Sequence, residues 1–219
     1  MYNDFWIPLQ LSIKISSVAS FFVIILGIII ARLMARKSFR GKVLLETLFL
    51  LPLVLPPSVV GFFLVVFLGR NSFIGQGVEW LFNAPIIFTW WAGVIAAIVV
   101  AFPLMYQTAK TGFQAVDPEI EDASKVDGAG ELKTFLHITL PLAMKSIVAG
   151  SLLSFARALG EFGATLMFAG NIPGKTQTVP TAIYVAMETG NMKLAWAWVL
   201  SMILISFIML MIIHFFNKN

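Results

Sequence analysis

The sequence predicts an all-α integral membrane protein with about five transmembrane helices. Hydrophobic residues make up 59% of the 219 residues and charged residues only 12%, a proportion that a soluble domain of this length could not bury inside one core. A bilayer offers no hydrogen-bond partners to an open backbone, so helices are the expected form. The strands of a membrane barrel would be short segments of alternating hydrophobicity, whereas the apolar runs here are long and continuous.

Five apolar stretches are long enough to cross a bilayer, which takes ~20 residues of helix. They cover residues 15–34, 47–68, 86–109, 146–168 and 194–216. The first stretch lies where a secretory signal would lie, but basic residues follow the apolar run instead of preceding it, which favours a retained span. We therefore expect residues 1–219 to form a single transmembrane domain.

Basic residues predict how the chain is oriented. The loop after the first stretch contains the basic residues Arg32, Arg36, Lys37, Arg40 and Lys42. Lys and Arg concentrate in cytoplasmic loops, so this loop is expected inside. Alternation then places the N-terminus outside, residues 110–145 inside and the C-terminus inside. The net charge of +4 follows from this topology and gives no reason to expect nucleic acid as a partner.

The cytoplasmic segment 110–145 has the signals of two short helices. Asp117 is a favourable N-cap, Pro118 suits the first helical position, and Gly128 can end the helix about ten residues later. A second short helix is expected over residues 131–137. By these signals alone, the segment is either a solvated connector or a docking surface for a soluble partner.

One motif in this segment resembles the EAA loop of ABC importer permeases. It consists of Asp122-Ala123-Ser124, three residues, Gly128, nine residues and then Ile138-x-Leu140-Pro141. The family has Glu and Ala where this chain has Asp122 and Ser124, although Glu121 adjoins the motif. The resemblance implies that the loop inserts into a groove of an ATPase subunit and converts nucleotide-driven closure into a tilt of the spanning helices. The residues expected to take part are Glu121, Asp122, Ala123, Ser124, Gly128, Ile138, Leu140 and Pro141.

Four further stretches are similar to the molybdate permeases in particular. They are LPLVLPPSVVGF, GRNSFIG, AFPLM and ARALGEFGATLMFAGNIPGKTQTVPTAIY. The last of them resembles the molybdate and tungstate group, with sulfate permeases next nearest. The resemblance implies the type I ABC importer permease fold, a location in the cytoplasmic (inner) membrane, and transport of molybdate or tungstate.

The resemblance also implies partners. We expect a homodimer whose path lies at the two-fold axis, two ATPase subunits that hold ATP and Mg²⁺ on the cytoplasmic side, and an extracytoplasmic oxyanion-binding protein. The chain itself is expected to bind no cofactor, metal or nucleic acid. Sulfate or thiosulfate import is the alternative within ATP-driven transport. An ion-coupled secondary carrier is the alternative outside it, although the inverted repeats common in such carriers are not visible.

Several residues inside the apolar stretches are candidates for the translocation path. Pro52, Pro56 and Pro57 predict a break near Ser58, because proline removes a backbone donor from a helix. The freed backbone would either line a wet cavity or form a packing kink. Pro103 in the third stretch invites the same two interpretations.

Two charged residues lie within the fourth stretch. Arg157 and Glu161 are four residues apart, on one face of the expected helix. Charges inside a span usually face a cavity or the bundle interior. Arg157 would therefore either attract a passing dianion or form a neutralising structural pair with Glu161, and we favour the pair. Thr165 is a further path candidate, although it also suits close helix packing.

The chain contains no set of residues for hydrolysing nucleotide by itself. The string GNIPGKT at residues 170–176 resembles a P-loop, but only three residues separate its glycines, no strand precedes it and the orientation places it outside. His137 and His214 have no ligand partners at metal spacing. No nucleophile, base and orienting group occur as a set. We therefore expect a transport subunit without a catalytic site.

Overall fold

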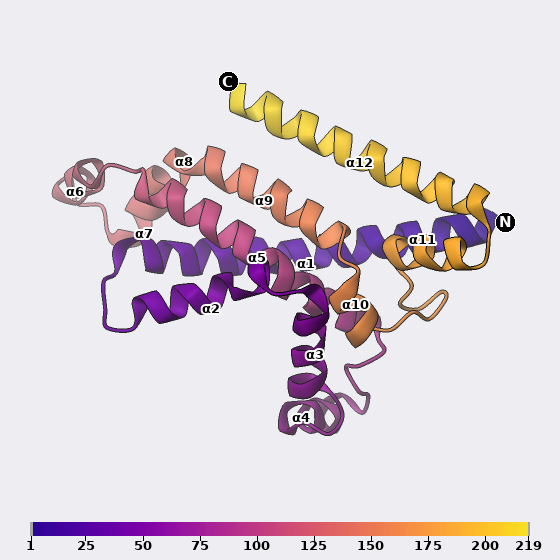
Figure 1. The fold of residues 1–219 in the computed structure, drawn as a ribbon. Helices are drawn as coiled ribbons and strands as arrows, with labels where there is room; N and C mark the ends of the chain where they lie inside the picture. The colour runs from indigo at the N-terminus through magenta and orange to yellow at the C-terminus, as the bar shows by residue number, and fades with distance from the viewer. Residues whose placement is uncertain (1, 219) are drawn as a thin grey trace.

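The computed structural model describes the backbone of residues 2–218 and the side chains of residues 5–212 and 215. Every regular element in this range is helical, which confirms the predicted class (Figure 1). The elements are α1 Tyr2–Arg36, α2 Lys42–Val54, α3 Pro57–Leu68, α4 Phe73–Phe82, α5 Trp90–Gln114, α6 Pro118–Val126, α7 Glu131–Thr134, a π-helical turn at Phe135–Thr139, α8 Leu140–Leu142, α9 Met144–Leu159, α10 Gly163–Phe168, α11 Val179–Glu188 and α12 Met192–Lys218.

The described helices include three to five candidate membrane spans. α1, α5 and α12 are each long and apolar enough to cross a bilayer. Two further apolar stretches consist of helix pairs with sharp bends, 117° between α2 and α3 and 71° between Glu131–Leu142 and α9. If each bent pair counts as one span, the total is five, as predicted, although the second pair includes Glu131–Leu142, which the sequence predicts to be cytoplasmic.

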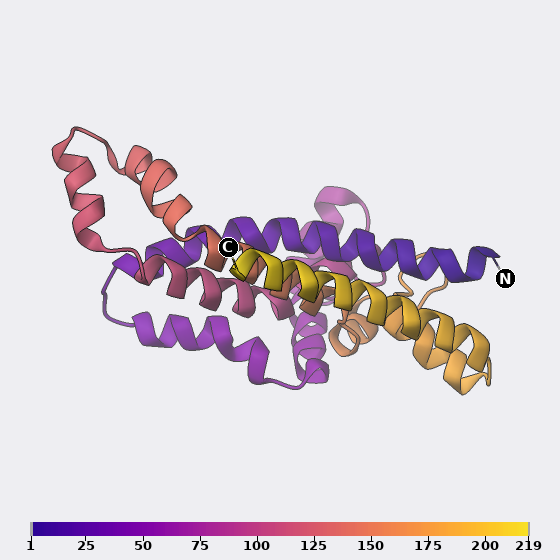
Figure 2. The ribbon, with the colours of Figure 1, turned by 90° about the horizontal axis from the view of Figure 1, so that it is seen from above.

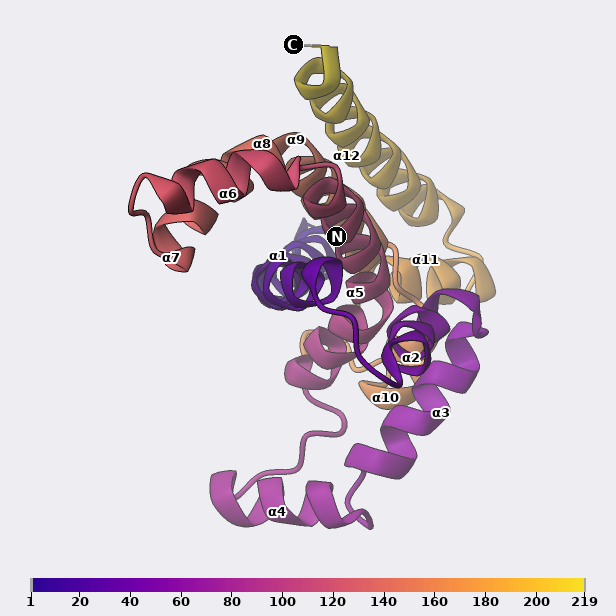
Figure 3. The ribbon, with the colours of Figure 1, turned by 90° about the vertical axis from the view of Figure 1, so that its left-hand side faces the viewer.

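α5 lies at the centre of the molecule and packs against α1, α2, α9 and α10 (Figure 3). Small residues allow these close approaches. A Cβ added at Gly27 of α1 would come within 2.5 Å of the Cγ of Met105 on α5. The buried core therefore runs along α5, with Val100, Met105 and Phe113 among its fully enclosed side chains.

The segments that were predicted to be cytoplasmic share one end of the bundle. Figures 1 and 2 show the α1–α2 loop at the same end of the bundle as α6 and α7, while the start of α1 and the α11–α12 turn lie at the opposite end. For these segments the arrangement is the one that the predicted orientation requires, whereas α4, in the loop that alternation also places outside, projects from the side of the bundle (Figure 1). The orientation in a membrane stays a prediction.

The predicted break in the second stretch occurs, but two to three residues earlier than Ser58. Leu55 and Pro56 are extended, with ψ of 142° and 137°, and α3 begins at Pro57. A residue that precedes proline is pushed out of the α region, which applies to Leu55 and again to Pro56. Pro57 then occupies the first helical position, which tolerates proline. The single prolines Pro52 and Pro103 lie inside α2 and α5 without ending them.

The fourth stretch is also discontinuous, contrary to the expectation of one helix over residues 146–168. α9 ends at Leu159 and α10 begins at Gly163. α10 crosses α3 at very short range. A Cβ added at Gly163 would come within 2.8 Å of the Cβ of Pro57. A Cβ at Gly61 of α3 would lie 3.1 Å from the Cα of Ala164. These glycines therefore permit the crossing of the two short helices.

Candidate functional site

The cytoplasmic segment begins with the helix that the sequence predicts. Asp117 caps α6, since its side chain accepts a hydrogen bond of 2.9 Å from the backbone N–H of Glu119, and Pro118 opens the helix. Gly128 follows the helix with a φ of +88°, a conformation that glycine adopts without the steric cost of a side chain. The local sequence therefore fixes both ends of α6.

The second half of the segment folds back onto α6 through two hydroxyl contacts. Ser124 and Thr134 lie 2.8 Å apart through their hydroxyl oxygens. Thr139 is fully buried in the π-helical turn and donates a hydrogen bond of 2.6 Å to Oε1 of Glu121. π-helical turns are rare and often occur at functional sites. Here the turn carries the residue that joins the two halves of the segment.

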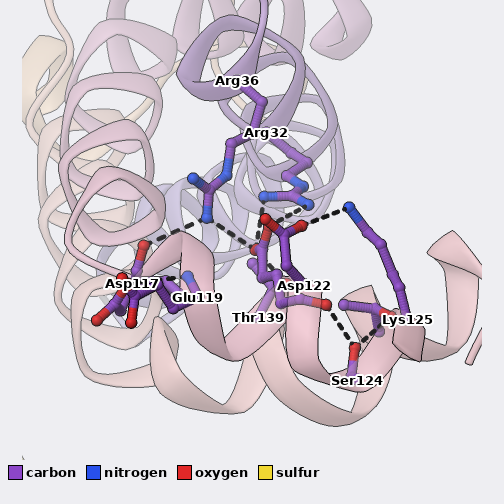
Figure 4. Close-up of polar contacts among 11 residues, drawn as sticks. Arg32, Arg36, Asp117, Glu119, Asp122, Ser124, Lys125 and Thr139 are labelled. Atoms are coloured by element: carbon purple, nitrogen blue, oxygen red, sulfur yellow. Dashed lines mark hydrogen bonds and ion pairs between the residues drawn. The ribbon is translucent and has the colours of Figure 1, made fainter. Parts of the chain in front are cut away.

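Glu121 also forms two ion pairs with the last turns of α1, and Figure 4 labels the two arginines that supply them, Arg32 and Arg36. Its Oε1 lies 3.0 Å from Nη1 of Arg32 and 2.9 Å from Nη2 of Arg36. Nη2 of Arg32 also donates a hydrogen bond of 3.3 Å to Oε2. We call Arg32, Arg36, Glu121 and Thr139 the Glu121 clasp. It joins α1 to a segment that is far away in the sequence.

The clasp holds a buried charge. The Glu121 side chain is only 6% exposed, whereas those of Arg32 and Arg36 are 24% and 27% exposed. Burial raises the pKa of Glu121, but the hydrogen bonds from Thr139, Arg32 and Arg36 together outweigh it and hold the pKa below its ordinary value. Glu121 is therefore an ionised carboxylate at neutral pH.

The remaining motif residues face outward or take part in the fold of the segment. The Asp122 side chain is 72% exposed and pairs with Lys125 at 3.2 Å, so the two adjacent acids have opposite environments. Ser124 donates a hydrogen bond to the backbone carbonyl of Glu121. The others are exposed or half-buried: Ala123, Gly128 and Pro141 are exposed, and Ile138 and Leu140 are half-buried.

Three members of the clasp were not candidates in the sequence. Arg32 and Arg36 served only to orient the chain, and Thr139 occupied the unspecified position of the motif. The four-residue spacing of the two arginines, which places them on one face of α1, was the available signal for a shared partner. Nothing local identified that partner as Glu121, which is 89 residues from Arg32.

A hollow of about 510 Å³ lies beside the clasp. Arg32, Arg36, Lys37 and Lys125 line it together with Glu131 and Phe135. The cytoplasmic segment therefore does not pack flush against the end of α1. Charged side chains bridge part of the space between them.

The path candidates lie in several elements, two of which meet. Pro56, Pro57 and Ser58 lie at the exposed α2–α3 bend, Pro52 is half-buried within α2, and Pro103 is buried within α5. Thr165 is 2% exposed in α10. Among the described residues, the α2–α3 bend lies against the start of α10, where a Cβ at Gly163 would come within 2.8 Å of the Cβ of Pro57, and the role of the candidates in transport stays a prediction.

Arg157 and Glu161 form an ion pair at the break between α9 and α10. Nη1 of Arg157 lies 2.8 Å from Oε2 of Glu161, and the Glu161 side chain is 2% exposed. The other oxygen, Oε1, accepts a hydrogen bond of 2.8 Å from the backbone N–H of Ala164. Glu161 therefore supports the start of α10 as well as the pair, which sequence spacing alone did not indicate.

A second polar cluster connects α2 to α5. Oε1 of Glu46 lies 2.6 Å from Nζ of Lys110 and accepts a hydrogen bond of 3.3 Å from the hydroxyl of Tyr106. Sequence reasoning missed this cluster because Glu46 and Lys110 are 64 residues apart. Such a pair fixes the position of α2 on α5 near the end of the bundle that holds the α1–α2 loop.

Among the described residues, no group of three or more His, Cys, Asp or Glu side chains could hold a metal ion. His137 contacts the backbone carbonyl of Lys133 at 3.1 Å, and the side chain of His214 lies outside the described residues. In the P-loop-like string, the Thr176 hydroxyl accepts a hydrogen bond of 2.9 Å from the backbone N–H of Ile172. That threonine is fully buried and stabilises the fold of its own loop.

Comparison with known proteins gives a family. The family model described as "Binding-protein-dependent transport system inner membrane component" matches residues 23–219. The chain is 62% identical over 212 residues to the putative molybdenum transport system permease protein YvgM of Bacillus subtilis (strain 168), covering 97% of this chain and 93% of that one. It is 45% identical over 184 residues to the molybdenum transport system permease protein ModB of Escherichia coli (strain K12), covering 84% and 80%.

A more distant relative and the solved structures complete the comparison. The sulfate transport system permease protein CysT of Salmonella typhimurium is 34% identical over 171 residues, covering 78% of this chain and 61% of that one. The MetNI methionine ABC transporter in its inward-facing form superposes with a TM-score of 0.75 over 100% of this chain and 97% of that one, at 13% identity. A bacterial alginate ABC importer gives 0.73 over 98% and 78%, at 16% identity. These structures share the fold.

Proposed function

The chain belongs to the family of binding-protein-dependent transport system inner membrane components, and on that premise we propose that it is the permease subunit of an ATP-driven molybdate importer. As a member of this family with several apolar helices, it is a multi-pass membrane protein. The observation that carries the coupling role is the part of the cytoplasmic segment that lies between α5 and α9, residues 115–143. It projects from one end of the bundle (Figure 2) and is tied to it by the Glu121 clasp.

The exposed side of this segment is the surface for the ATPase. Asp122 faces outward, and two large apolar side chains, Val126 and Leu132, are 87% and 71% exposed. Exposed apolar side chains next to charges are typical of a protein-binding surface. A docked ATPase would hold ATP and Mg²⁺, and its closure would move the segment and the helices attached to it.

The assembly that we propose has two permease copies, two ATPase subunits and an extracytoplasmic oxyanion-binding protein. The single chain supports a dimer in one respect, because the path candidates Pro56, Pro57 and Ser58 at the α2–α3 bend are exposed in it. A second copy related by a two-fold axis would complete the path. The binding protein would deliver the oxyanion at the end that holds the N-terminus.

Molybdate is the proposed substrate because the relatives with 62% and 45% identity are molybdenum permeases by name. Tungstate is included, since it has the same charge and tetrahedral shape. Sulfate is the second candidate, supported by the 34% identical sulfate permease. The lower identity of that relative favours the first candidate.

Uptake by the reconstituted complex tests the proposal. The permease is purified with its ATPase, placed in vesicles with the binding protein, and supplied with labelled molybdate and ATP. Excess tungstate is expected to compete, whereas excess sulfate leaves uptake nearly unchanged. If the complex takes up sulfate and molybdate does not reduce that uptake, the substrate is sulfate and not molybdate. Uptake that needs an ion gradient and no ATPase would refute ATP-driven transport.

A further inference from the structure

We propose that Arg32, Arg36 and Glu121 are positioning residues that make α1 move together with the cytoplasmic segment. This role rests on the proposed function, because it names the helix that transmits motion from the docked segment. α1 would carry that motion from the clasp to α11 and α12 at the opposite end of the molecule.

α1 depends on side chains for its connection to the segment. α5 runs into the segment and α9 runs out of it, so both helices follow it through the backbone. α1 has no such covalent connection. Among the described residues, the polar contacts between α1 and the segment come from Arg32 and Arg36, including a hydrogen bond of 3.2 Å from Arg36 to the carbonyl of Val116.

The clasp fixes a geometry that apolar packing would leave free. Apolar contacts are non-directional and allow neighbouring helices to slide. Charge-assisted hydrogen bonds to a planar guanidinium are directional, and Arg32 engages both oxygens of Glu121. The other contacts at this point are with apolar groups and include the ring of Phe135, whose centroid lies 5.8 Å from the guanidinium carbon of Arg32. A loss of the charge on Glu121 would therefore release α1 from the segment.

The far end of α1 is also tied down by hydrogen bonds. The Ser12 hydroxyl accepts a bond of 2.7 Å from the backbone N–H of Val179, at the start of α11. The backbone carbonyl of Phe5 accepts one of 3.0 Å from Nε1 of Trp198 on α12. Because α1 is one unbroken helix, displacement at the clasp reaches α11 and α12 through it.

Spin labels test whether α1 follows the segment. The chain has no cysteine, so Lys37→Cys reports on the end of α1 and Lys133→Cys reports on α7, with one label on each permease copy. Distances between the labels of the two copies are measured in the assembled importer with and without ATP. In the native background we expect both distances to change. In Glu121→Gln, the change at residue 133 persists and the change at residue 37 falls by about half or more.

Transport supplies the second measurement. Arg36→Gln is expected to lower uptake per ATP hydrolysed by roughly two- to thirty-fold while the ATPase stays bound. Arg40→Gln, which neutralises an exposed arginine in the adjacent loop, leaves that ratio unchanged. Arg36→Lys keeps the positive charge but lacks the planar guanidinium, so we expect a smaller loss of uptake per ATP hydrolysed. This variant replaces Arg36→Gln in the test if Arg36→Gln does not assemble with the ATPase.

The outcomes separate this role from the proposed function. If residue 37 moves as far in Glu121→Gln as in the native protein while residue 133 also moves, the positioning role is wrong and the importer remains. Unchanged uptake per ATP in both Arg36 variants would overturn the role as well. If neither label moves with ATP in the native complex, the coupling segment itself is misassigned and the proposed function fails first.

Discussion

At the scale of single residues, two adjacent acidic residues of the cytoplasmic segment have different surroundings and different roles. Glu121 is turned inward to the arginines of α1, and Asp122 is turned outward to solvent. Successive helical residues point ~100° apart, so one short helix can serve both directions. We infer that an inward acid keeps the segment on its own chain, while the outward face is left for a partner.

The charge on Glu121 makes the stability of the clasp dependent on pH. The pKa of Glu121 is lowered in the folded state from the ordinary value of 4.5. The contribution of its charge to the free energy of unfolding is therefore fully present above that value and is lost as the pH falls through the folded pKa. We expect the native protein to melt at a higher temperature than Glu121→Gln at pH 7. The difference should shrink below pH 4.5 in detergent melting curves. A difference independent of pH would contradict the ionised state.

Gly128 gives a test of the coupling segment at a single position. Its φ of +88° and open surroundings mean that Gly128→Val costs backbone strain of about 1–2 kcal/mol and no clash. Gly190 has a φ of +74° and equally open surroundings in the α11–α12 turn, so Gly190→Val is a matched control. We expect both variants to insert but only Gly128→Val to lose co-purification of the ATPase. If Gly128→Val retains association and transport, the coupling role of the loop is wrong.

At the scale of elements, local signals were enough where neighbouring residues decide the structure. The capping of α6 by Asp117 and its end at Gly128 are local events, and the sequence predicted both. The break after α2 was predicted but displaced, because the restriction acts on Leu55 and Pro56, which precede prolines, and not on the residue that follows them. The break between α9 and α10 was missed. It depends on Glu161 as an acceptor for Ala164 and on contact with α3, and neither contact is visible in hydropathy.

The Arg157–Glu161 pair belongs to this break, and its role can be measured by paired neutralisation. Arg157→Gln leaves a buried, unpaired carboxylate, which typically costs about 3 kcal/mol. In the double variant with Glu161→Gln, the amide oxygen can still accept from Ala164 while the charge is gone. We expect the double variant to recover the stability and uptake that Arg157→Gln loses. Recovered stability without recovered uptake would instead favour contact between Arg157 and the anion.

At the scale of the whole molecule, two of the long candidate spans, α1 and α12, are largely uncovered in the single chain. Only 17% of the span window in α12 is buried, and α12 diverges from the bundle toward its C-terminus (Figure 1). Composition predicted this excess of apolar surface. It did not predict which part meets lipid and which part meets a second copy, because both surroundings favour the same residues.

The orientation of the whole chain can be measured with introduced cysteines. Val126→Cys lies in α6 at a site that is 87% exposed, and Lys175→Cys lies in the exposed loop before α11. In intact cells, a membrane-impermeant thiol reagent is expected to label Lys175→Cys alone. After permeabilisation it should label both. Labelling of Val126→Cys in intact cells would place the segment outside, where no ATPase could bind it.

The length of α1 has a further consequence. Its 35 residues extend over ~52 Å, well beyond the ~30 Å of hydrocarbon in a bilayer, and it is hydrogen-bonded near both ends. One residue inserted between Ser12 and Arg32 would rotate the two ends relative to each other by ~100°, so only one set of contacts could form. Seven inserted residues, close to two full turns, would nearly restore the angular phase. Related chains are therefore expected to vary the length of this helix in whole turns.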